Sequence, residues 1–211
     1  MIKMGSNSQT ETSVDSYKRS ERWKKQRQKI LNVAGRLFAK KGYLGTSIED
    51  IAKAVKVNKA IIYYYFENKS YLLYEVISDT LDELIAPAMQ ISKSNKRAEE
   101  KLRDLIKSHV QWQLTHYWLS GIGYVEIKNL SPRLRKTYIT KRDQYENIFR
   151  EVVKTGITQK EFRSCDPKLT TLIILGSINS IILWYRPGGR LSAMEISSQA
   201  SDFIMHAVKA R

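Results

Sequence analysis

The chain is poor in the residues that build covalent and metal-held frameworks. It has 211 residues but a single cysteine, Cys165, so it cannot form an internal disulfide. Its three histidines, His109, His116 and His206, have no metal-ligand spacing with one another or with the cysteine. The sequence also lacks a glycine-rich phosphate loop after a strand and a nucleophile beside a base. We therefore expect no catalytic residues, no metal and no cofactor, which argues against an enzyme.

Long hydrophobic runs are equally scarce. The most apolar run covers residues 169–184, is 16 residues long and contains serine, threonine and asparagine. A membrane-spanning helix needs about 20 mostly apolar residues, so this run is too short. The N-terminus has no apolar segment of the kind found in signal peptides. We expect a soluble cytoplasmic protein without a membrane partner.

Acidic residues are too few to balance the basic ones. The chain has 36 Lys and Arg against 21 Asp and Glu, which gives a formal net charge of +15. The excess is concentrated in residues 17–69, which hold 14 basic and 4 acidic residues. This balance indicates a polyanionic partner, either nucleic acid or an anionic membrane surface.

Helix-start and helix-stop residues predict an all-α fold. Apolar residues from Ile30 to Phe38 recur with helical spacing, and Gly42 is placed to end that helix. Pro87 is expected to end or kink a later helix. Residues 1–16 are polar without periodicity and are interpreted as a disordered tail. No segment has a convincing strand pattern. The expected helices cover residues 17–41, 47–55, 59–66, 69–86, 97–117, 121–128, 132–155, 167–184 and 193–209.

Residues 46–69 predict two short helices joined by a tight turn. Thr46 or Ser47 is placed to cap the first helix, and Asn58 is placed to cap the second. Lysines flank the second helix, which carries an aromatic cluster. This layout is typical of a helix-turn-helix that sets its second helix into the DNA major groove. The apolar members expected in the core are Ile61, Ile62 and Phe66.

The polar residues of this motif divide into base-reading and phosphate-binding candidates. The N-terminal residues of a recognition helix lie at the base edges, so Lys59 and Ala60 are candidates for base contacts. Phenol hydroxyls further along the helix can reach a base edge or a phosphate. Thr46 would offer its hydroxyl and backbone N–H to a phosphate at a helix N-terminus. The candidate DNA-binding residues are Thr46, Ser47, Lys56, Asn58, Lys59, Ala60, Tyr63, Tyr64, Tyr65 and Lys69.

Residues 27–73 resemble the DNA-binding domain of TetR-type transcriptional regulators. The resemblance is specific because its parts occur together and in order. The matching elements are Ala34-x-x-Leu37-Phe38-x-x-x-Gly42-Tyr43, Thr46-Ser47-x-x-x-Ile51-Ala52, Val57-Asn58-Lys59-Ala60-x-Ile62-Tyr63-x-Tyr65-Phe66 and Asn68-Lys69-x-x-Leu72.

The resemblance implies a repressor that binds a palindromic operator in double-stranded DNA as an all-α homodimer and is released by a small-molecule effector. It implies a helix-turn-helix DNA-binding domain over residues 17–68 and a ligand-binding and dimerisation domain over residues 69–211. Two residues depart from the family pattern. Lys56 stands where the family usually has glycine, so a non-glycine residue must adopt a left-handed conformation at the turn. Tyr65 replaces the usual histidine and offers a hydroxyl to a phosphate instead.

The second half of the chain resembles a TetR subgroup of acyl-CoA-responsive repressors of fatty-acid and steroid breakdown. This resemblance implies a long-chain acyl-CoA effector and control of genes of fatty-acid or lipid metabolism. The residues that carry it are Arg142-Asp143-x-Tyr145-x-x-x-Phe149, Gly156, Phe162, Asp166-Pro167, Gly176-x-x-Asn179 and Trp184-Tyr185-x-Pro187.

Two roles are expected of this second half. The helix over residues 167–184 is apolar nearly all round, which predicts burial on more than one side, and with the last helix it could build a four-helix dimer interface. Aromatic residues of the middle helices could line an apolar pocket, and arginines could meet the phosphates of coenzyme A. The candidate ligand-binding residues are Trp112, Tyr117, Tyr124, Arg133, Arg142, Phe149, Asn179, Trp184 and Arg186.

Two other functions compete with this interpretation. A TetR-type sensor of multiple drugs or aromatic compounds would place acidic groups near a cationic ligand, and Glu126 is the central acid available for that role. A membrane-surface protein would also explain the net charge of +15. The basic N-terminal helix lacks the bulky apolar face that insertion into a membrane surface requires, however.

Overall fold

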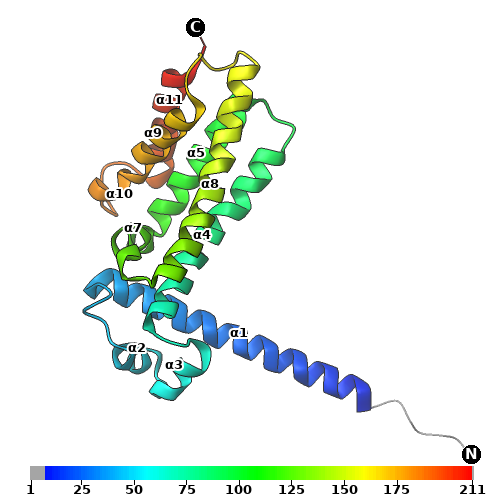
Figure 1. Cartoon of the computed structure of the whole chain (residues 1–211), viewed down its shortest axis with the longest axis vertical. Helices are drawn as coiled ribbons and strands as arrows, with labels where there is room; N and C mark the ends of the chain where they lie inside the picture. The colour runs from blue at the N-terminus through cyan, green and yellow to red at the C-terminus, as the bar shows by residue number, and fades with distance from the viewer. Residues whose placement is uncertain (1–7, 211) are drawn as a thin grey trace, which may run out of the picture. The chain divides into compact units, whose positions relative to one another are not determined.

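The computed structural model describes residues 8–210, with side chains from Ser20 onward, and these residues are almost entirely helical (Figure 1). Within them the only β-type pairing is an isolated bridge between Phe162 and Lys209. The expected all-α class is confirmed. The chain divides into two compact units, which meet in sequence between Val76 and Ile77.

The first unit is a three-helix motif that continues into a longer helix. It contains α1 (Ser8–Lys41), α2 (Ile48–Val55), α3 (Lys59–Tyr65) and the first two turns of α4 (Lys69–Lys93). Gly42 ends α1 in the left-handed region, at φ 73°, as the sequence predicts. The fully buried side chains that hold these helices together are Ile30, Phe38, Ile51, Ile62, Phe66, Leu72 and Leu73.

Helix α1 begins earlier than the composition suggests. Residues 8–16, expected to belong to a disordered tail, continue α1 without a break. Starting a helix is costly because the backbone angles of several residues must be fixed for the first hydrogen bond. Extending an existing helix fixes only one residue for each new bond, so polar residues can be added to the end of a helix that has already formed. Residues 1–7 of the expected tail lie outside the described residues.

The boundary between the units also lies later than expected, at Val76 instead of residue 68. The reason is that the start of α4 packs within the first unit, where Leu72 and Leu73 are fully buried. Arg27 of α1 forms an ion pair with Glu75 of α4. The Arg27 guanidinium also lies 5.4 Å from the centre of the Phe66 ring.

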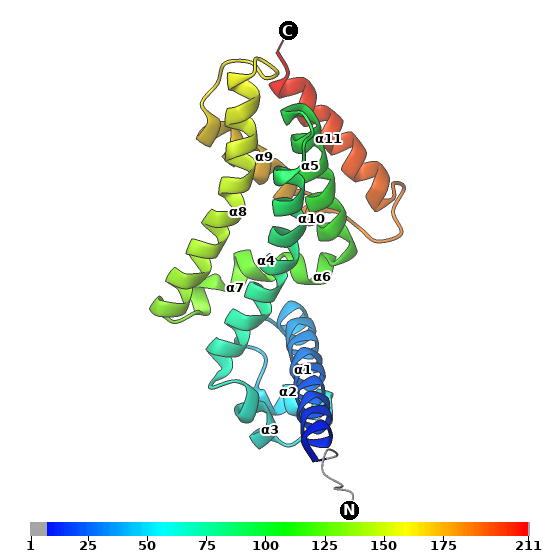
Figure 2. The same ribbon diagram turned by 90° about the vertical axis from the view of Figure 1, so that its right-hand side faces the viewer.

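The second unit is a bundle built around α5 and α8. Helix α5 packs against α11, α8 and α9, and α8 packs against α9 (Figures 1 and 2). Three of its helices are capped by a serine or an aspartate. The side-chain oxygens of Ser131, Asp166 and Ser192 accept from backbone N–H groups. After α4, the unit contains α5 (Ala98–Thr115), α6 (Tyr117–Ser120), α7 (Ile122–Glu126), the 3₁₀ helix η1 (Ile127–Asn129), α8 (Pro132–Thr158), α9 (Pro167–Asn179), α10 (Ile181–Trp184) and α11 (Ala193–Val208).

Helix α4 and the helix expected over residues 167–184 also differ from their expected lengths. Helix α4 was predicted to stop near Ala86 but continues through Pro87 to Lys93. Ala88, directly after the proline, is 2% exposed, so the segment beyond Pro87 is packed within the second unit although the proline removes one backbone bond. The predicted helix over residues 167–184 is divided at Ser180, whose hydroxyl donates to the carbonyl of Ser177 at 2.8 Å. Such a local bond competes with the regular helical pattern.

Pro167–Trp184 is the stretch, among the described residues, that by length and composition alone could cross a membrane, with a mean hydropathy of 1.4. Only 22% of it is buried within the chain. Thr171, Ile174 and Ile178 form the buried side, and the expectation of burial on more than one side is therefore wrong for a single chain. The inner side belongs to the core of the second unit, and the outer side remains exposed.

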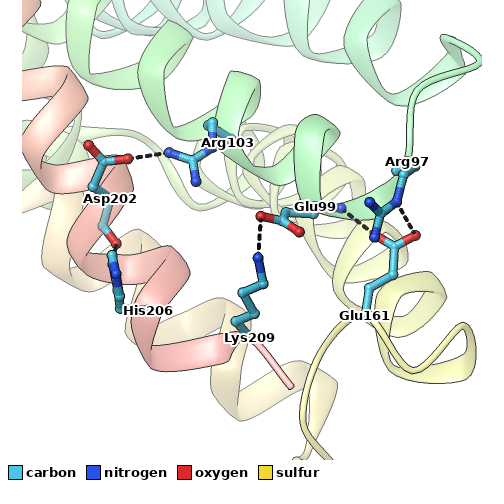
Figure 3. A network of polar contacts seen from close by, with 7 residues as sticks. All are labelled: Arg97, Glu99, Arg103, Glu161, Asp202, His206 and Lys209. Carbon is cyan, nitrogen blue, oxygen red and sulfur yellow. Dashed lines mark hydrogen bonds and ion pairs between the residues drawn. The ribbon is translucent and has the colours of Figure 1, made fainter. Parts of the chain in front are cut away.

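An ionic network fastens the end of the second unit (Figure 3). Arg103 of α5 pairs with Asp202 of α11, and Lys209 pairs with Glu99 at 3.2 Å. Glu161 accepts from the backbone N–H of Glu99 at 2.8 Å. The network therefore ties the start of α5 to the last helix and to the connection between α8 and α9.

Candidate functional sites

The two helices of the predicted DNA-reading motif are capped as the sequence predicts. Ser47 accepts from the backbone N–H of Asp50 at 3.0 Å, and the Asp50 carboxylate accepts from the Ser47 backbone N–H at 2.9 Å. Asn58 accepts from the backbone N–H of Ile61 at 2.9 Å and so begins α3. Lys56 has φ 64° and ψ 49°, which is the left-handed conformation expected at this turn.

Helix α3 presents an aromatic and basic face to solvent. Tyr63 is 45% exposed and Tyr64 is 71% exposed. Such high exposure is unusual for large aromatic side chains. Ala60 and Lys59 are exposed beside them. Lys59 forms an ion pair with Glu49, and this contact lowers the pKa of the Glu49 carboxyl. The Lys59 ammonium also lies 5.7 Å from the centre of the Tyr63 ring. A phosphate would compete with Glu49 for this lysine.

Tyr65 and Lys69 are positioned by aromatic neighbours elsewhere in the first unit. The Tyr65 ring lies 5.3 Å from that of Trp23 on α1, and burial raises the pKa of its phenol. The Lys69 ammonium lies 4.2 Å from the centre of the Tyr43 ring. Such cation–π contacts hold a lysine in place without neutralising its charge.

Two residues of the motif have different roles from those predicted. Thr46 is 1% exposed, and its hydroxyl lies 2.9 Å from the carbonyl oxygen of Gly42 and 3.2 Å from that of Leu37. Its hydroxyl therefore anchors the loop before α2, and the prediction that it binds a phosphate is wrong. Ile61 is 36% exposed, so it lies on the outer face of α3 and not in the core.

The second unit encloses a cavity of about 380 Å³ between α4, α5, α7, α8 and α9. Its volume is within the range of small-molecule sites in proteins. The apolar part of its wall consists of Ile77, Leu81, Leu84, Ile127, Leu172 and Leu175.

A directed chain of hydrogen bonds forms the polar part of the cavity wall. His109 Nδ1 lies 2.9 Å from the Tyr145 hydroxyl, and His109 Nε2 lies 3.0 Å from Asn179 Oδ1. Burial lowers the pKa of His109 to about 4, so at neutral pH the ring is uncharged and has one N–H. Because Asn179 Oδ1 only accepts, that N–H is on Nε2, and the Tyr145 hydroxyl donates to Nδ1. Burial also raises the pKa of Tyr138 to about 12.

Charged and polar groups complete the cavity. Trp112 donates its indole N–H to Glu83 at 2.8 Å. Arg142 and Glu146 line the wall from α8, and Glu146 lies 3.6 Å from Arg150. Gln113 donates from Nε2 to the Asn179 carbonyl at 3.1 Å. The wall therefore combines apolar side chains with groups that can orient a ligand.

The cavity brings together four of the nine predicted ligand-binding residues, namely Trp112, Tyr124, Arg142 and Asn179. Phe149 is fully buried next to Tyr145 and serves as core. Tyr117, Arg133 and Arg186 are exposed outside the cavity wall. Trp184 lines a separate groove. Glu126, nominated as the central acid, is buried and accepts from Asn129 at 2.6 Å, whereas Glu146 is the acid in the wall.

The sequence reasoning missed several polar residues of the wall. His109 and Gln113 lie three residues before and one residue after Trp112, so all three share one face of α5. Tyr138 and Tyr145 share a face of α8 with Arg142 for the same reason. This recurrence of polar and aromatic residues at helical spacing is the pattern that could have identified them.

The outer faces of α9, α10 and α11 carry exposed apolar side chains. A groove of about 230 Å³ lies between these helices and is lined by Trp184, Phe203 and neighbouring aliphatic residues. Phe203 is 78% exposed and Leu183 is 85% exposed. Gathered exposed apolar residues are typical of surfaces that pack against another molecule. The other exposed members are Leu169, Ile173 and Met194.

Comparison with known families identifies both units. The family model described as "Bacterial regulatory proteins, tetR family" matches residues 30–76. The model described as "Tetracyclin repressor-like, C-terminal domain" matches residues 95–208. The two matches cover the helix-turn-helix and most of the second unit.

Individual relatives extend over most of the chain. The HTH-type transcriptional repressor KstR2 of Mycobacterium tuberculosis is 28% identical over 184 residues, which cover 86% of this chain and 92% of the relative. The TetR family regulator PfmR of Thermus thermophilus has a crystal structure with a TM-score of 0.78 and 32% identity, covering 84% of this chain and 97% of that one. The structure of AibR in complex with isovaleryl coenzyme A and operator DNA has a TM-score of 0.77 and 24% identity. The match covers 87% of this chain and 98% of the AibR chain. At that identity AibR shows a shared fold alone.

Proposed function

Because the chain belongs to the TetR family of bacterial regulatory proteins, we propose that it is a repressor that binds a palindromic operator as a homodimer and is released by an acyl-CoA. The observation that carries the DNA-binding part is the exposed face of α3. It presents Tyr63, Tyr64 and Lys59 on a capped helix, in the region with the largest positive charge. In this proposal α3 lies in the major groove, and Lys56 and Lys69 contact flanking phosphates.

The exposed apolar surface of α9, α10 and α11 supports the homodimer. A second copy of the chain is the occupant that the family relationship favours, and a two-fold pairing would bury Phe203, Trp184 and Leu183. It would also place two α3 helices on successive major grooves, which is why the operator should be palindromic. This assignment explains why Pro167–Trp184 is apolar on a side that the single chain leaves exposed.

The cavity of the second unit supports a small-molecule effector with an apolar part. Its 380 Å³ would accommodate an acyl group and part of a pantetheine arm, while the adenine nucleotide would remain outside. Arg142 is exposed at its side chain and lines the wall, so it is placed to meet an anionic group entering the cavity. AibR, which shares the fold, has been crystallised with a coenzyme A thioester and operator DNA together.

Helix α4 provides a covalent route between effector and DNA. Its residues 69–76 belong to the first unit, and its residues from Ile77 onward include Leu81 and Leu84 of the cavity wall. We propose that the effector stabilises a conformation of the dimer in which the two α3 helices no longer fit adjacent grooves. The differential affinity of the effector for the two conformations sets the extent of release.

Selection from a random DNA duplex library tests the DNA-binding part. We expect a palindromic consensus with half-sites centred about one helical turn apart, bound far more tightly than random duplex. Vesicles of anionic lipid provide the competing partner in a parallel assay. Equal affinity for consensus and random duplex, or preferential binding to the vesicles, would contradict the proposal.

A gel-shift titration of that consensus complex tests the effector. Palmitoyl-CoA should release the DNA at concentrations where palmitate has little effect. Arg142→Gln should weaken the response to palmitoyl-CoA, whereas Arg133→Gln, a matched change of an exposed arginine outside the cavity wall, should not. A complex that resists palmitoyl-CoA but dissociates with a cationic aromatic compound would favour the drug-sensor alternative, with Glu146 as the acid facing the ligand.

A further inference from the structure

Tyr138 contributes an unpaired hydroxyl to the wall of the cavity. This residue of α8 is 8% exposed and lines the cavity, and its hydroxyl has no hydrogen-bond partner among the described residues. Within the part of the chain that the structure describes, the side-chain atoms that are both enclosed and unpaired belong to Gln26, Gln113 and Thr171. The Tyr138 oxygen is not one of them, so it keeps accessible surface in an otherwise buried side chain.

Gly123 of α7 shows where this hydroxyl lies. A Cβ atom at Gly123 would lie 2.5 Å from the Tyr138 oxygen and 4.0 Å from Cβ of Ile77. Gly123, Ile77 and Tyr138 all line the cavity. The phenol therefore crosses from α8 to the α7 side of the wall, and the absence of a side chain at Gly123 leaves room for its hydroxyl.

The Tyr138 hydroxyl is available as a donor. Burial raises its pKa to about 12, so it keeps its proton at neutral pH. Acceptors elsewhere in the wall are used by other wall groups, since His109 Nδ1 pairs with the Tyr145 hydroxyl and Glu83 accepts from the Trp112 indole. Buried hydroxyls are normally hydrogen-bonded, so the unused O–H of Tyr138 is suited to a ligand.

We infer that the effector presents a neutral carbonyl oxygen to the Tyr138 hydroxyl, which makes Tyr138 a specificity-determining residue. Water can accept this bond in the free protein, and a ligand that displaces the water without an acceptor loses affinity. A carbonyl accepts without bringing a charge into the wall. A carboxylate would carry a larger desolvation cost and would share the wall with the carboxylate of Glu146.

Arg142 gives the site a direction. It lies four residues after Tyr138, so both side chains are on one face of α8, and both line the cavity. The Arg142 side chain is 50% exposed, whereas Tyr138 is buried. An effector whose neutral carbonyl is followed by an anionic part nearer to solvent would meet the two groups in that order.

This inference rests on the proposed function in treating the cavity as the effector site. If the effector is an acyl-CoA, the carbonyl is that of the thioester; otherwise it belongs to a ketone or ester. Both sources offer the same acceptor to Tyr138. A test with one ligand pair of each kind separates the role of Tyr138 from the acyl-CoA assignment.

The experiment uses isothermal titration calorimetry on the full chain with two matched ligand pairs. Acetophenone is compared with α-methylstyrene, in which a methylene group replaces the carbonyl oxygen. Octanoyl-CoA is compared with the thioether S-octyl-CoA, which lacks the carbonyl. The proteins are the wild type, Tyr138→Phe and, as a matched control, Tyr117→Phe, which changes an exposed tyrosine outside the cavity wall.

We expect Tyr138→Phe to weaken the carbonyl member of at least one pair by roughly 2- to 12-fold and not to weaken its analogue. Tyr117→Phe should weaken neither member. A merely structural role for Tyr138 would weaken both members of a pair equally, and that result would overturn the inference. Failure of the wild type to bind either carbonyl ligand would overturn it as well.

The position of the hydroxyl is tested at the two glycines of this region. Gly123→Ala forces the phenol to move and should reduce binding of the carbonyl member as Tyr138→Phe does. Gly121→Ala is the matched control, because a Cβ atom there would meet nothing within 4 Å. Equal affinities of both alanine variants for the carbonyl ligand would contradict the placement of the hydroxyl.

Infrared spectroscopy keeps the inference testable if Tyr138→Phe does not fold. The carbonyl stretch of a ligand bound to wild-type protein should lie at a lower wavenumber than in a hydrocarbon solvent, because the oxygen accepts a hydrogen bond. An unshifted stretch would overturn the inference. Sensitivity of acetophenone to Tyr138→Phe, combined with no binding of octanoyl-CoA, would reject the acyl-CoA assignment while supporting the role of Tyr138.

Discussion

The two units place their functional side chains in opposite ways. In the first unit Tyr63 and Tyr64 are exposed on the short helix α3, which begins at the adjacent cap residue Asn58. In the second unit His109, Tyr145 and Gln113 are buried and come from helices far apart in sequence. One unit displays its aromatic residues outward, while the other encloses its polar residues.

This difference matches the size of the partner that each unit is proposed to recognise. A DNA duplex is larger than the unit that binds it, so the reading groups must protrude and remain accessible. A small effector must be surrounded, so its recognising groups must be desolvated and already oriented. Substitutions of the exposed tyrosines should accordingly affect binding but not stability in the first unit, whereas substitutions of the buried polar residues should affect both in the second.

The largest effect on stability is expected for Phe149→Ala. Phe149 is fully buried between α8 and its neighbours, and removing a buried phenyl ring costs about 3–5 kcal/mol. Urea unfolding at fixed protein concentration measures this loss. Tyr117→Ala, at an exposed tyrosine of the same unit, should change the unfolding free energy by less than about 0.5 kcal/mol. A loss below about 1 kcal/mol for Phe149→Ala would show that the core can adjust around the site.

His109 should make the stability of the second unit depend on pH. Its pKa is about 4 in the folded chain, below the ordinary value of 6.5, so the unfolded chain binds a proton first as pH falls. Stability is therefore full above about pH 6.5 and declines between about 6.5 and 4, by roughly 3 kcal/mol. His109→Gln should remove this part of the decline in urea unfolding curves taken across that range.

The matched control for the pH experiment is His206→Gln, which changes an exposed histidine of α11. It should leave the decline as it is in the wild type. If His109→Gln and wild type lose stability in parallel between pH 6.5 and 4, His109 is not a buried neutral group.

Tyr64→Ala should weaken operator binding without affecting folding. A lost base-edge or phosphate contact is worth about 1–3 kcal/mol, which corresponds to roughly 5- to 150-fold in affinity. Fluorescence anisotropy on the selected operator measures the affinity, and Tyr117→Ala again provides an exposed tyrosine outside the motif. If Tyr64→Ala changes neither the operator affinity nor the unfolding free energy, Tyr64 does not contact the operator.

The smallest expected effect is a gain in stability for Lys56→Gly. Lys56 has φ 64°, where a non-glycine residue is strained by about 1 kcal/mol, so glycine should stabilise the turn by about 0.5–1 kcal/mol. If Lys56 contacts a phosphate, the same variant binds DNA with a shallower dependence on salt. Thermal unfolding and binding at several salt concentrations measure the two effects separately. A loss of stability would show that the lysine side chain contributes contacts that outweigh the strain.

The first unit could be predicted closely from sequence because its determinants are local. Ser47, Asn58 and Gly42 each act within four residues of the helix end that they set, so the chain itself specifies them. Thr46 shows where this reasoning fails. A threonine before a helix looks like a phosphate-binding residue, but its burial depends on how the preceding loop folds back.

The cavity was harder to predict because its residues meet only after the helices pack. The bond between His109 and Asn179 joins residues 70 positions apart. Aromatic residues alone do not reveal which of them line a cavity, and Phe149 and Trp112 look equivalent in the sequence although one is core and the other is wall. The direction of the hydrogen bonds depends on burial, which no local pattern reports.

Pro87 gives α4 an uneven stiffness along its length. Proline has no N–H, so the carbonyl of Glu83, one turn earlier, lacks the backbone bond that an ordinary residue would provide. The turn that lacks this bond contains the cavity-lining residue Leu84, so α4 is expected to bend most easily beside the cavity wall.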